Sequence, residues 1–488
     1  MRRLRVVLFY ILVVVYLIVC PLTVLYALGY LYQPGPEQGI VKGGLIYVST
    51  APPGASVYIG NRRYTKKTPT IVRNLLPGEY PVRLTLRGHQ PWSQLLPVET
   101  GKATVLEHVL MLPQELRQAT VWAETFEDLV PLAGGQAILL SRGPLLGDQF
   151  LYECKNQVVR PLIPAASSWA RLKLTKTYAV DDSPVWLAVV SSVDGERVLR
   201  IDPRPAEPSV EDVTALFMDR PLDVLWDPRE PDQLFTLQAG YVNRLDLGSR
   251  VVHPRLIEGV RGLGVFRRNL YVLRDQGVID RMDRDGKRVE GVLDDAVLGQ
   301  TLFGERGAYR ITLLTDRLML FLGEHGELLA SRLPYRFVDH GVLGFEGHPQ
   351  HQRVLFWQKD RLGVLDFSQE GVDTELFERG PRIRWVTKDA EHIEQAFWAF
   401  DGSHIVYRDH HRVMLAELET YGPLHAQELV QIKPGSSIAY AEETGQIYFL
   451  DRVTGRLKAL ELVPKRELVP FPFPERNEPS VHTNPRGF

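Results

Sequence analysis

Hydrophobic residues fill one long stretch near the N-terminus. No charged residue occurs from Val6 to Tyr32, and this stretch is long enough to cross about 30 Å of hydrocarbon as a helix. A cleaved signal peptide has an apolar region of only about 7 to 15 residues, which disfavours cleavage here. The pattern predicts a transmembrane anchor at residues 6–32 that contacts the lipid bilayer.

Charged residues on the two sides of this stretch predict its orientation. Arg2, Arg3 and Arg5 precede it, whereas the first basic residue after it is Lys42. Positively charged flanks stay on the cytoplasmic side, so residues 1–5 are expected in the cytoplasm. We therefore expect a single-pass protein of the cell membrane whose bulk lies outside the cytoplasm, in the periplasm or on the cell surface.

A Pro/Gly linker at residues 33–42 leads into a region where hydrophobic and polar residues alternate. Two strands are predicted around Leu45–Tyr47 and Val57–Ile59, joined by a turn, and three more at Thr70–Arg73, Tyr80–Arg87 and Ala103–Leu110. Short strands separated by turns make a compact all-β sandwich, which we place at residues 43–113.

The same region carries the motifs of a known family. In chain order they are GLIYVSTAPPGAS at Gly44–Ser56, the step Thr68-Pro69, LPGEY at Leu76–Tyr80, and Gly88-His89 followed by Trp92. With Pro53 where glutamate is usual and His89 in the aromatic place, the region resembles the PEGA domain. The resemblance implies a small β-sandwich of bacterial and archaeal surface or membrane-attached proteins, and it implies no catalytic residues.

This region is also basic. Residues 39–113 contain nine Lys and Arg against three Glu, a net charge of +6. Arg62, Arg63, Lys66 and Lys67 cluster in a predicted hairpin loop, which makes them the candidate anion contact of the chain. The candidate ligands are anionic lipid headgroups or anionic wall polymers, and the alternative is an ordinary solvated surface.

From about Thr120 to Pro464 one sequence pattern, which we call the apolar phrase, recurs: an apolar strand, a polar turn and a second apolar strand. The copies follow one another at steps of 36 to 50 residues. We align them at Gln136, Trp186, Leu234, Leu270, Leu313, Leu355, Ile405 and Ile447. A period of about 40 to 45 residues with four short strands per unit is the signature of a β-propeller, which we place at residues 119–464.

The number of blades is expected to be seven or eight, because the first copy is poorly formed and could share strands with the last. The repeat resembles WD40-like and quinoprotein-like propellers in pattern only. The phrase D-x-x-T-G occurs cleanly once, at Asp451–Gly455, and gives no evidence for a quinone cofactor. The expected fold is therefore mainly β: one transmembrane helix, a PEGA-like β-sandwich and a β-propeller.

Charge and composition narrow the possible functions. The whole chain has 488 residues and a net charge of −2, which argues against a nucleic-acid partner. Residues 114–464 carry −11, so an acidic propeller follows a basic module. Two cysteines, Cys20 and Cys154, cannot make a disulfide scaffold. The five prolines of residues 465–488 predict a disordered or extended tail.

Motifs of known chemistry are scarce. The sequence has no nucleophile elbow, no His-Glu-x-x-His and no phosphate-binding glycine loop. His348 with His351 and the pair His410-His411 are weak metal candidates, and Asp283–Gly286 fits a hairpin turn better than a calcium loop. We expect no catalytic residues, no cofactor and no metal site.

These observations favour a non-enzymatic, membrane-anchored protein that presents its propeller to a protein or an envelope polymer. The alternative is an enzyme at the central funnel of the propeller, acting on glycans or using a quinone. A purely structural spacer is a third possibility.

Overall fold

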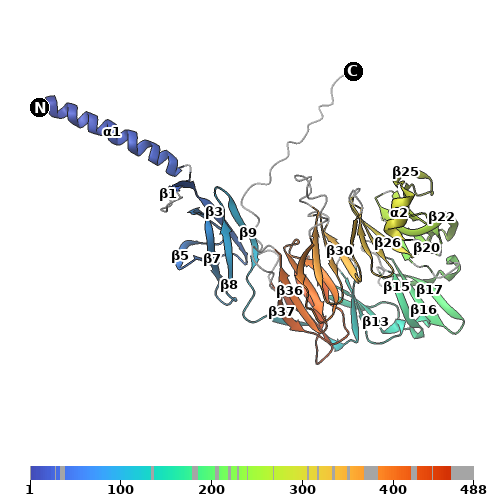
Figure 1. Cartoon of the computed structure of the whole chain (residues 1–488). Helices are drawn as coiled ribbons and strands as arrows, with labels where there is room; N and C mark the ends of the chain where they lie inside the picture. The colour runs from blue at the N-terminus through green and yellow to red at the C-terminus, as the bar shows by residue number, and fades with distance from the viewer. Residues whose placement is uncertain are drawn as a thin grey trace, which may run out of the picture. The chain divides into compact units, whose positions relative to one another are not determined.

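The structure is a computed structural model of the chain. Figure 1 shows the whole chain. The structure describes residues 2–27, 29–32, 39–132, 137–178, 185–203, 208–217, 221, 223–227, 230–238, 240–267, 269–304, 307–315, 318–331, 336–348, 352–367, 383–418, 426–441 and 443–462. The expected tail at 465–488 therefore lies outside the described residues. The chain divides into two compact units: of the described residues, the first contains those up to Arg117 together with Leu462, and the second contains the others from Gln118 to Glu461.

The apolar stretch forms helix α1 (Arg2–Ala27), which continues through Pro21. Within it, Phe9–Ala27 has a mean hydropathy of 2.5 and is long enough to cross a membrane. The predicted end at Tyr32 is wrong. Gly29 has a φ of 84°, a left-handed value that glycine adopts without strain, and its N–H donates to the Tyr26 carbonyl at 3.0 Å.

Beyond the helix the chain forms a small antiparallel ribbon. Strand β1 (Tyr30–Tyr32) pairs with β2 (Ile40–Lys42), so the predicted linker ends in a strand. This pairing returns the chain to the helix end, where the N–H of Gly43 donates to the carbonyl of Gly29 at 2.7 Å. The next domain therefore begins one hydrogen bond away from the last turn of α1.

That domain is a two-sheet sandwich. Its strands are β3 (Gly44–Ala51), β4 (Ser56–Ile59), β5 (Arg62–Lys67), β6 (Thr70–Leu75), β7 (Gly78–Thr85), β8 (Trp92–Val98) and β9 (Ala103–Leu110). They form the sheets β6-β3-β9 and β5-β4-β7-β8. The turn between β3 and β4 crosses from one sheet to the other, and buried side chains such as Ile46, Val57 and Leu84 fill the space between the sheets.

The second unit is built from short antiparallel strands. They are β10 (Arg117–Thr125), β11 (Asp128–Leu132), β12 (Ala137–Ser141), β13 (Gln149–Glu153), β14 (Val158–Pro161), β15 (Lys173–Tyr178), β16 (Trp186–Ser192), β17 (Gly195–Asp202), β18 (Ser209–Asp212), β19 (Asp223–Asp227), β20 (Glu230–Gln238), β21 (Gly240–Asp246), β22 (Val251–Phe266), β23 (Asn269–Arg274), β24 (Ile279–Met282), β25 (Arg288–Leu293), β26 (Tyr309–Thr315), β27 (Leu318–Gly323), β28 (Leu328–Ala330), β29 (Arg336–Asp339), β30 (Gly344–His348), β31 (Arg353–Trp357), β32 (Leu362–Asp366), β33 (Ile383–Thr387), β34 (Ile393–Ala399), β35 (His404–Asp409), β36 (Arg412–Glu417), β37 (Ala426–Gln431), β38 (Ala439–Ala441), β39 (Gln446–Leu450) and β40 (Arg456–Glu461). A short helix, α2 (Ala296–Phe303), stands between β25 and β26.

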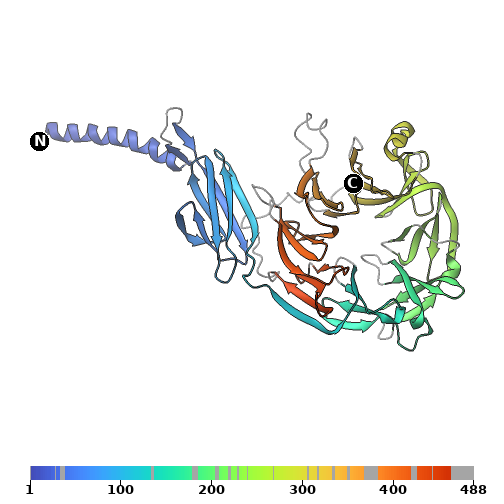
Figure 2. The ribbon, with the colours of Figure 1, turned by 60° about the horizontal axis from the view of Figure 1, so that its bottom comes forward.

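Within the described residues these strands make eight four-stranded blades. Five are separate sheets: β10-β40-β39-β38, β11 to β14, β15 to β18, β30 to β33 and β34 to β37. Three more, β19 to β22, β22 to β25 and β26 to β29, join into one 11-stranded sheet. The blades follow one another around a ring (Figure 2), which confirms the predicted β-propeller.

The three joined blades meet along the long strand β22. Its first part ends one blade and its second part begins the next, where Gly262 pairs in parallel with Tyr309 of β26. A Cβ on Gly262 would lie 2.7 Å from the Tyr309 carbonyl oxygen, so only glycine lets the two strands approach this closely.

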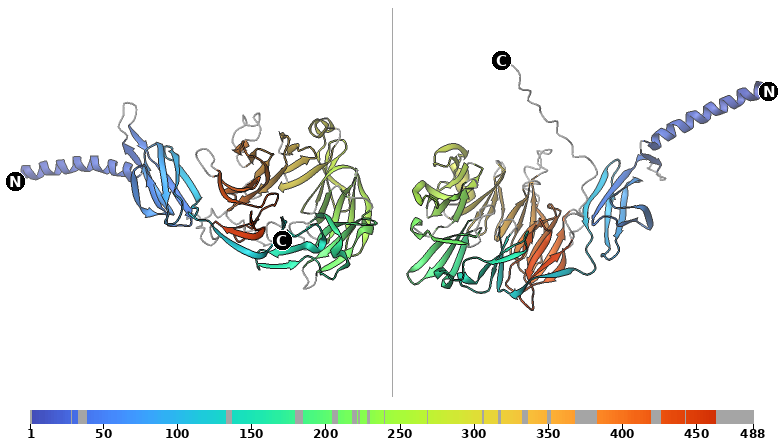
Figure 3. Two further views of the ribbon diagram at one scale, coloured as in Figure 1. Left: turned by 90° about the horizontal axis from the view of Figure 1, so that it is seen from below. Right: turned by 180° about the vertical axis from the view of Figure 1, so that it is seen from behind.

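The ring closes with a strand from each end of the propeller sequence. β10, the first strand, completes the sheet of the last three strands, β38, β39 and β40. Figure 3 shows the first and last strands of the propeller side by side. One core cluster holds Tyr152 of the first full blade together with Tyr448 of the last, and their rings lie 5.4 Å apart.

Candidate functional site

The four predicted anion contacts lie on one strand and not in a loop. Arg62, Arg63, Lys66 and Lys67 belong to β5, at the edge of the sheet β5-β4-β7-β8, and all four are exposed. The loop itself contains little more than Gly60 and the residue after it, because the positive φ of Gly60 (57°) permits a tight turn.

Strand register separates the four side chains. Residues directly opposite each other in a sheet point to the same face. Arg63 is opposite Tyr58 and Lys67 is opposite Ser56, on the face away from the sandwich core. Arg62 is opposite the buried Ile59. The sequence-based interpretation of a single cluster of four is therefore wrong in this respect, because the strand distributes the four over both faces.

The sheet face that points away from the sandwich core carries a further basic residue, which sequence reasoning missed. Arg83 of β7 is opposite both Tyr58 and Ser93, and its guanidinium carbon lies 4.9 Å from the centre of the Tyr58 ring. A cation over the face of a ring is attracted by the electrons of the ring. Tyr58, Arg83 and Ser93 line a shallow hollow of about 670 Å³, together with Pro81 and Leu95. The sequence signal that could have indicated Arg83 was the alternation of apolar and polar residues in β4 and β7.

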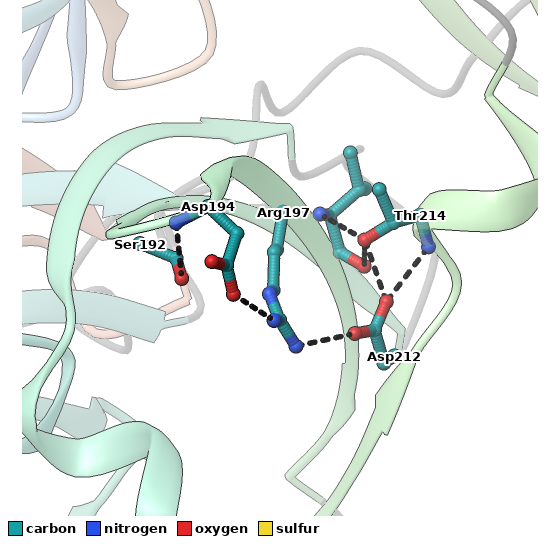
Figure 4. A network of polar contacts seen from close by, with 6 residues as sticks. Ser192, Asp194, Arg197, Asp212 and Thr214 are labelled. Atoms are coloured by element: carbon teal, nitrogen blue, oxygen red, sulfur yellow. Dashed lines mark hydrogen bonds and ion pairs between the residues drawn. The ribbon is translucent and has the colours of Figure 1, made fainter.

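The propeller carries a second polar cluster, at the edge of the blade β15 to β18 (Figure 4). Arg197 reaches Asp194 at 3.3 Å and Asp212 at 3.5 Å. Asp212 accepts hydrogen bonds from the N–H and the hydroxyl of Thr214, and the Thr214 hydroxyl oxygen accepts one from the Val198 N–H at 2.9 Å. This network fixes the chain after β18 onto β17.

The pKa of Asp212 reflects this role. Burial alone would raise it, but the hydrogen bonds from Thr214 and the charge of Arg197 outweigh burial and hold the pKa of that carboxyl below its ordinary value. Every polar group in the cluster is thus engaged in fixing the strand, and the cluster is structural.

We expect Thr214→Val to lower the free energy of unfolding by about 1 to 2 kcal/mol, because it leaves the Val198 N–H without its acceptor. Denaturant unfolding of the variant checks this. Thr214→Ser keeps the hydroxyl and should stay close to wild type, whereas a Thr214→Val variant as stable as wild type would contradict the assigned role of the hydrogen bond.

A third cluster surrounds a hollow of about 460 Å³ on the blade β22 to β25. The nearly buried Asp280 accepts from Arg274 at 3.1 Å and from Arg288 at 2.7 Å, and Arg288 also contacts Asp294 at 2.5 Å. Both guanidinium groups are already paired with carboxylates here. This hollow is therefore held together by its own ion pairs.

The predicted weak metal candidates do not assemble in the described part of the chain, where no group of three or more His, Cys, Asp or Glu side chains is placed to hold an ion. His348 packs edge-on against Trp398 at 5.5 Å, and His351 lies outside the described residues. His410 and His411 occupy the turn between β35 and β36. Hydrogen bonds from the N–H groups of Asp285 and Lys287 to the Asp283 carboxylate confirm a hairpin turn at Asp283.

Sequence comparison identifies the small sandwich. The chain matches the PEGA domain family over residues 44–114. These residues form a PEGA domain. Its motif residues are structural: the Thr68 hydroxyl accepts from the Ala55 N–H at 2.9 Å and hydrogen-bonds the Thr50 hydroxyl at 2.6 Å, while the Tyr80 hydroxyl donates to the Leu76 carbonyl. The exposed basic residues of the PEGA domain lie outside these motif contacts.

Structure comparison finds propellers. The Myceliophteria thermophila Cps50 (Swd1) β-propeller domain is similar at 11% identity, with a TM-score of 0.41, over 72% of this chain and 100% of that one. The Dos1 propeller is similar at 11% identity, with a TM-score of 0.43, over 72% of this chain and 95% of that one. No curated protein matches the sequence at a significant level. The propeller assignment rests on the strand order described above.

Proposed function

We propose that this chain is a single-pass, membrane-anchored binding or scaffold protein that presents its PEGA domain and β-propeller outside the cytoplasm. The observation that carries the proposal is the direct connection of an apolar helix to a PEGA domain through the hydrogen bond between Gly43 and Gly29. The arginines before the helix support a cytoplasmic N-terminus. A propeller supplies a rigid, broad surface for a protein or an envelope polymer.

Membrane orientation can be tested with engineered cysteines. Val193 and Val453 occupy turns of the propeller and are 104% and 90% exposed. In a Cys20→Ala background, Val193→Cys and Val453→Cys are expected to react with a membrane-impermeant maleimide in intact cells whose outer envelope is permeable to it. The buried Cys154 provides a low background. Labelling only after the membrane is broken would place the propeller in the cytoplasm and overturn this part of the proposal.

A binding role predicts a saturable partner. Crosslinking in intact cells, followed by mild detergent extraction and mass spectrometry, should recover one protein or polymer in reproducible stoichiometry with the full chain. The matched comparison is a variant of the full chain that carries substitutions on the propeller surface and keeps Arg63 and Arg83. Recovery of the chain alone would contradict a scaffold role and favour chemistry at the propeller funnel, the alternative stated above.

A further inference from the structure

The PEGA domain exposes one amphipathic sheet face. The outward face of the sheet β5-β4-β7-β8, as we use the term, comprises Tyr58, Arg63, Lys67, Pro81, Arg83 and Leu95. Cross-strand register places these side chains on one side, because Tyr58 is opposite Arg63 and Arg83, and Pro81 is opposite Leu95. Leu95 is 49% exposed. Strand β3 of the other sheet is buried on both faces, since Ile46 and Val48 as well as Tyr47 and Ser49 are at most 2% exposed.

The composition of the outward face suits a charged interface. Three cationic side chains share this side of the sheet with the ring of Tyr58 and the apolar Pro81 and Leu95. The one acidic residue of these four strands is Glu79, which is opposite Pro97 on the same side. Tyrosine prefers the headgroup level of a bilayer, where its ring is sheltered and its hydroxyl is hydrated. Arginine and lysine place their charged ends among phosphates while their stems cover apolar surface.

The domain that carries this face follows the membrane helix directly. The hydrogen bond from Gly43 to Gly29 fixes the start of β3 at the end of the membrane helix. Strand β7 has eight residues and is about 27 Å long. The outward face is therefore tethered to the membrane helix by a short connection, so even a weak contact with headgroups is favoured by a high effective concentration.

We propose that the outward face docks on the anionic headgroups of the membrane that holds α1. This inference rests on the membrane anchor of the proposed function, but not on which side of the membrane the propeller occupies. Charge complementarity selects the ligand: a phosphate-rich surface attracts each basic residue, whereas a neutral bilayer does not. Docking would orient the PEGA domain flat on the bilayer and so set the direction in which the chain leaves it.

The test uses the full chain reconstituted in vesicles. Ser93 is exposed, lies opposite Arg83 and is isosteric with cysteine, so a fluorophore on Ser93→Cys in a Cys20→Ala background reports on this face. Vesicles contain phosphatidylcholine alone or mixed with phosphatidylglycerol, each with a headgroup-attached quencher. We expect strong quenching only with phosphatidylglycerol, and loss of quenching at about 1 M salt, where the Debye length falls to about 3 Å. A label on Val193→Cys is the control position.

Charge-reversal variants test whether docking depends on the outward face or only on the net charge of the PEGA domain. Arg63→Glu with Arg83→Glu should lower the docking equilibrium at least about 25-fold, at about fivefold for each basic residue. Arg62→Glu with Lys66→Glu makes the same change in net charge at two positions of β5 outside the outward face, leaves Arg63 and Arg83 in place, and should retain quenching. Equal loss in both pairs, or equal quenching in neutral vesicles, would overturn the proposal.

Two further outcomes are decisive. If the chain floats with neutral vesicles but its quenching does not depend on phosphatidylglycerol, the membrane anchor is intact. That result contradicts the docking proposal and leaves the proposed function standing. A chain that fails to float with any vesicle contradicts the anchor itself. Binding of soluble polyphosphate without quenching would place the ligand in solution and also overturn lipid docking.

Discussion

Replacing Tyr448 by alanine is expected to lower the free energy of unfolding of the propeller by about 3 to 5 kcal/mol, the usual cost of deleting a large buried aromatic side chain. Tyr448 is 0% exposed and lies on β39, in the blade that closes the ring. Its ring packs edge-on against Tyr152 of β13. The substitution therefore removes packing at the joint between the first and last parts of the propeller sequence.

Tyr448→Phe is the matched control. It keeps the ring and removes only the hydroxyl, which hydrogen-bonds Gln446 at 2.7 Å, so we expect a loss of about 1 kcal/mol. Denaturant unfolding followed by near-ultraviolet circular dichroism measures both variants, with the transition of the PEGA domain fitted separately. Equal stability of the alanine and phenylalanine variants would mean that the aromatic joint does not hold the ring closed.

The closing strand shows what a repeat pattern can predict. The period of the apolar phrases predicted the propeller and the range of seven or eight blades. The first aligned copy falls on β12 and β13 of a complete four-stranded blade, so it is not poorly formed. The predicted sharing of strands between the first and last blades is confirmed by β10, which precedes that copy and completes the last blade. Sequence periodicity records strands but not their partners, and the pairing of β10 with β40 joins positions more than 300 residues apart.

Leu313 shows the limit of aligning apolar phrases. Most aligned residues fall on the second strand of their blades, as Leu355 does on β31 and Ile405 on β35. Leu313 instead lies on β26, the first strand of its blade, opposite Met319. The phrase around Leu313 contains two adjacent apolar strands like every other copy, so its hydrophobic pattern could not reveal that it begins one strand early.

The candidate anion contact illustrates the same gap between composition and geometry. Charge alone selected the four basic residues of β5, and it could not say that the outward face would combine Arg63 with Arg83. These residues are 20 positions apart, and only the register through Tyr58 brings them together. A sequence-level prediction of strand pairing in the sandwich would have found this combination, because alternation already marks Tyr58 and Arg83 as outward.

Cys154 is expected to resist alkylation in the folded protein by at least about 1,000-fold relative to an exposed thiol. Its side chain is 2% exposed, in the same core cluster as Tyr448. Burial is the main reason that its pKa rises from 9.0 to about 12. Since the thiolate is the reactive form, three pKa units at neutral pH remove about 1,000-fold of reactivity, and the lack of access removes more.

The same pKa shift makes stability depend on pH. Because folding favours the neutral thiol, the contribution of Cys154 to the free energy of unfolding is constant below about pH 9 and is lost as the pH rises from there toward about 12.

Peptide-resolved mass spectrometry after iodoacetamide treatment measures the reactivity of Cys154, with Val193→Cys as the exposed reference. In Tyr448→Ala, the alkylation of Cys154 should become faster, since both residues share one cluster and local opening at the joint exposes the thiol. Alkylation of native Cys154 as fast as that of Val193→Cys would show that the joint between the first and last blades is not closed in solution.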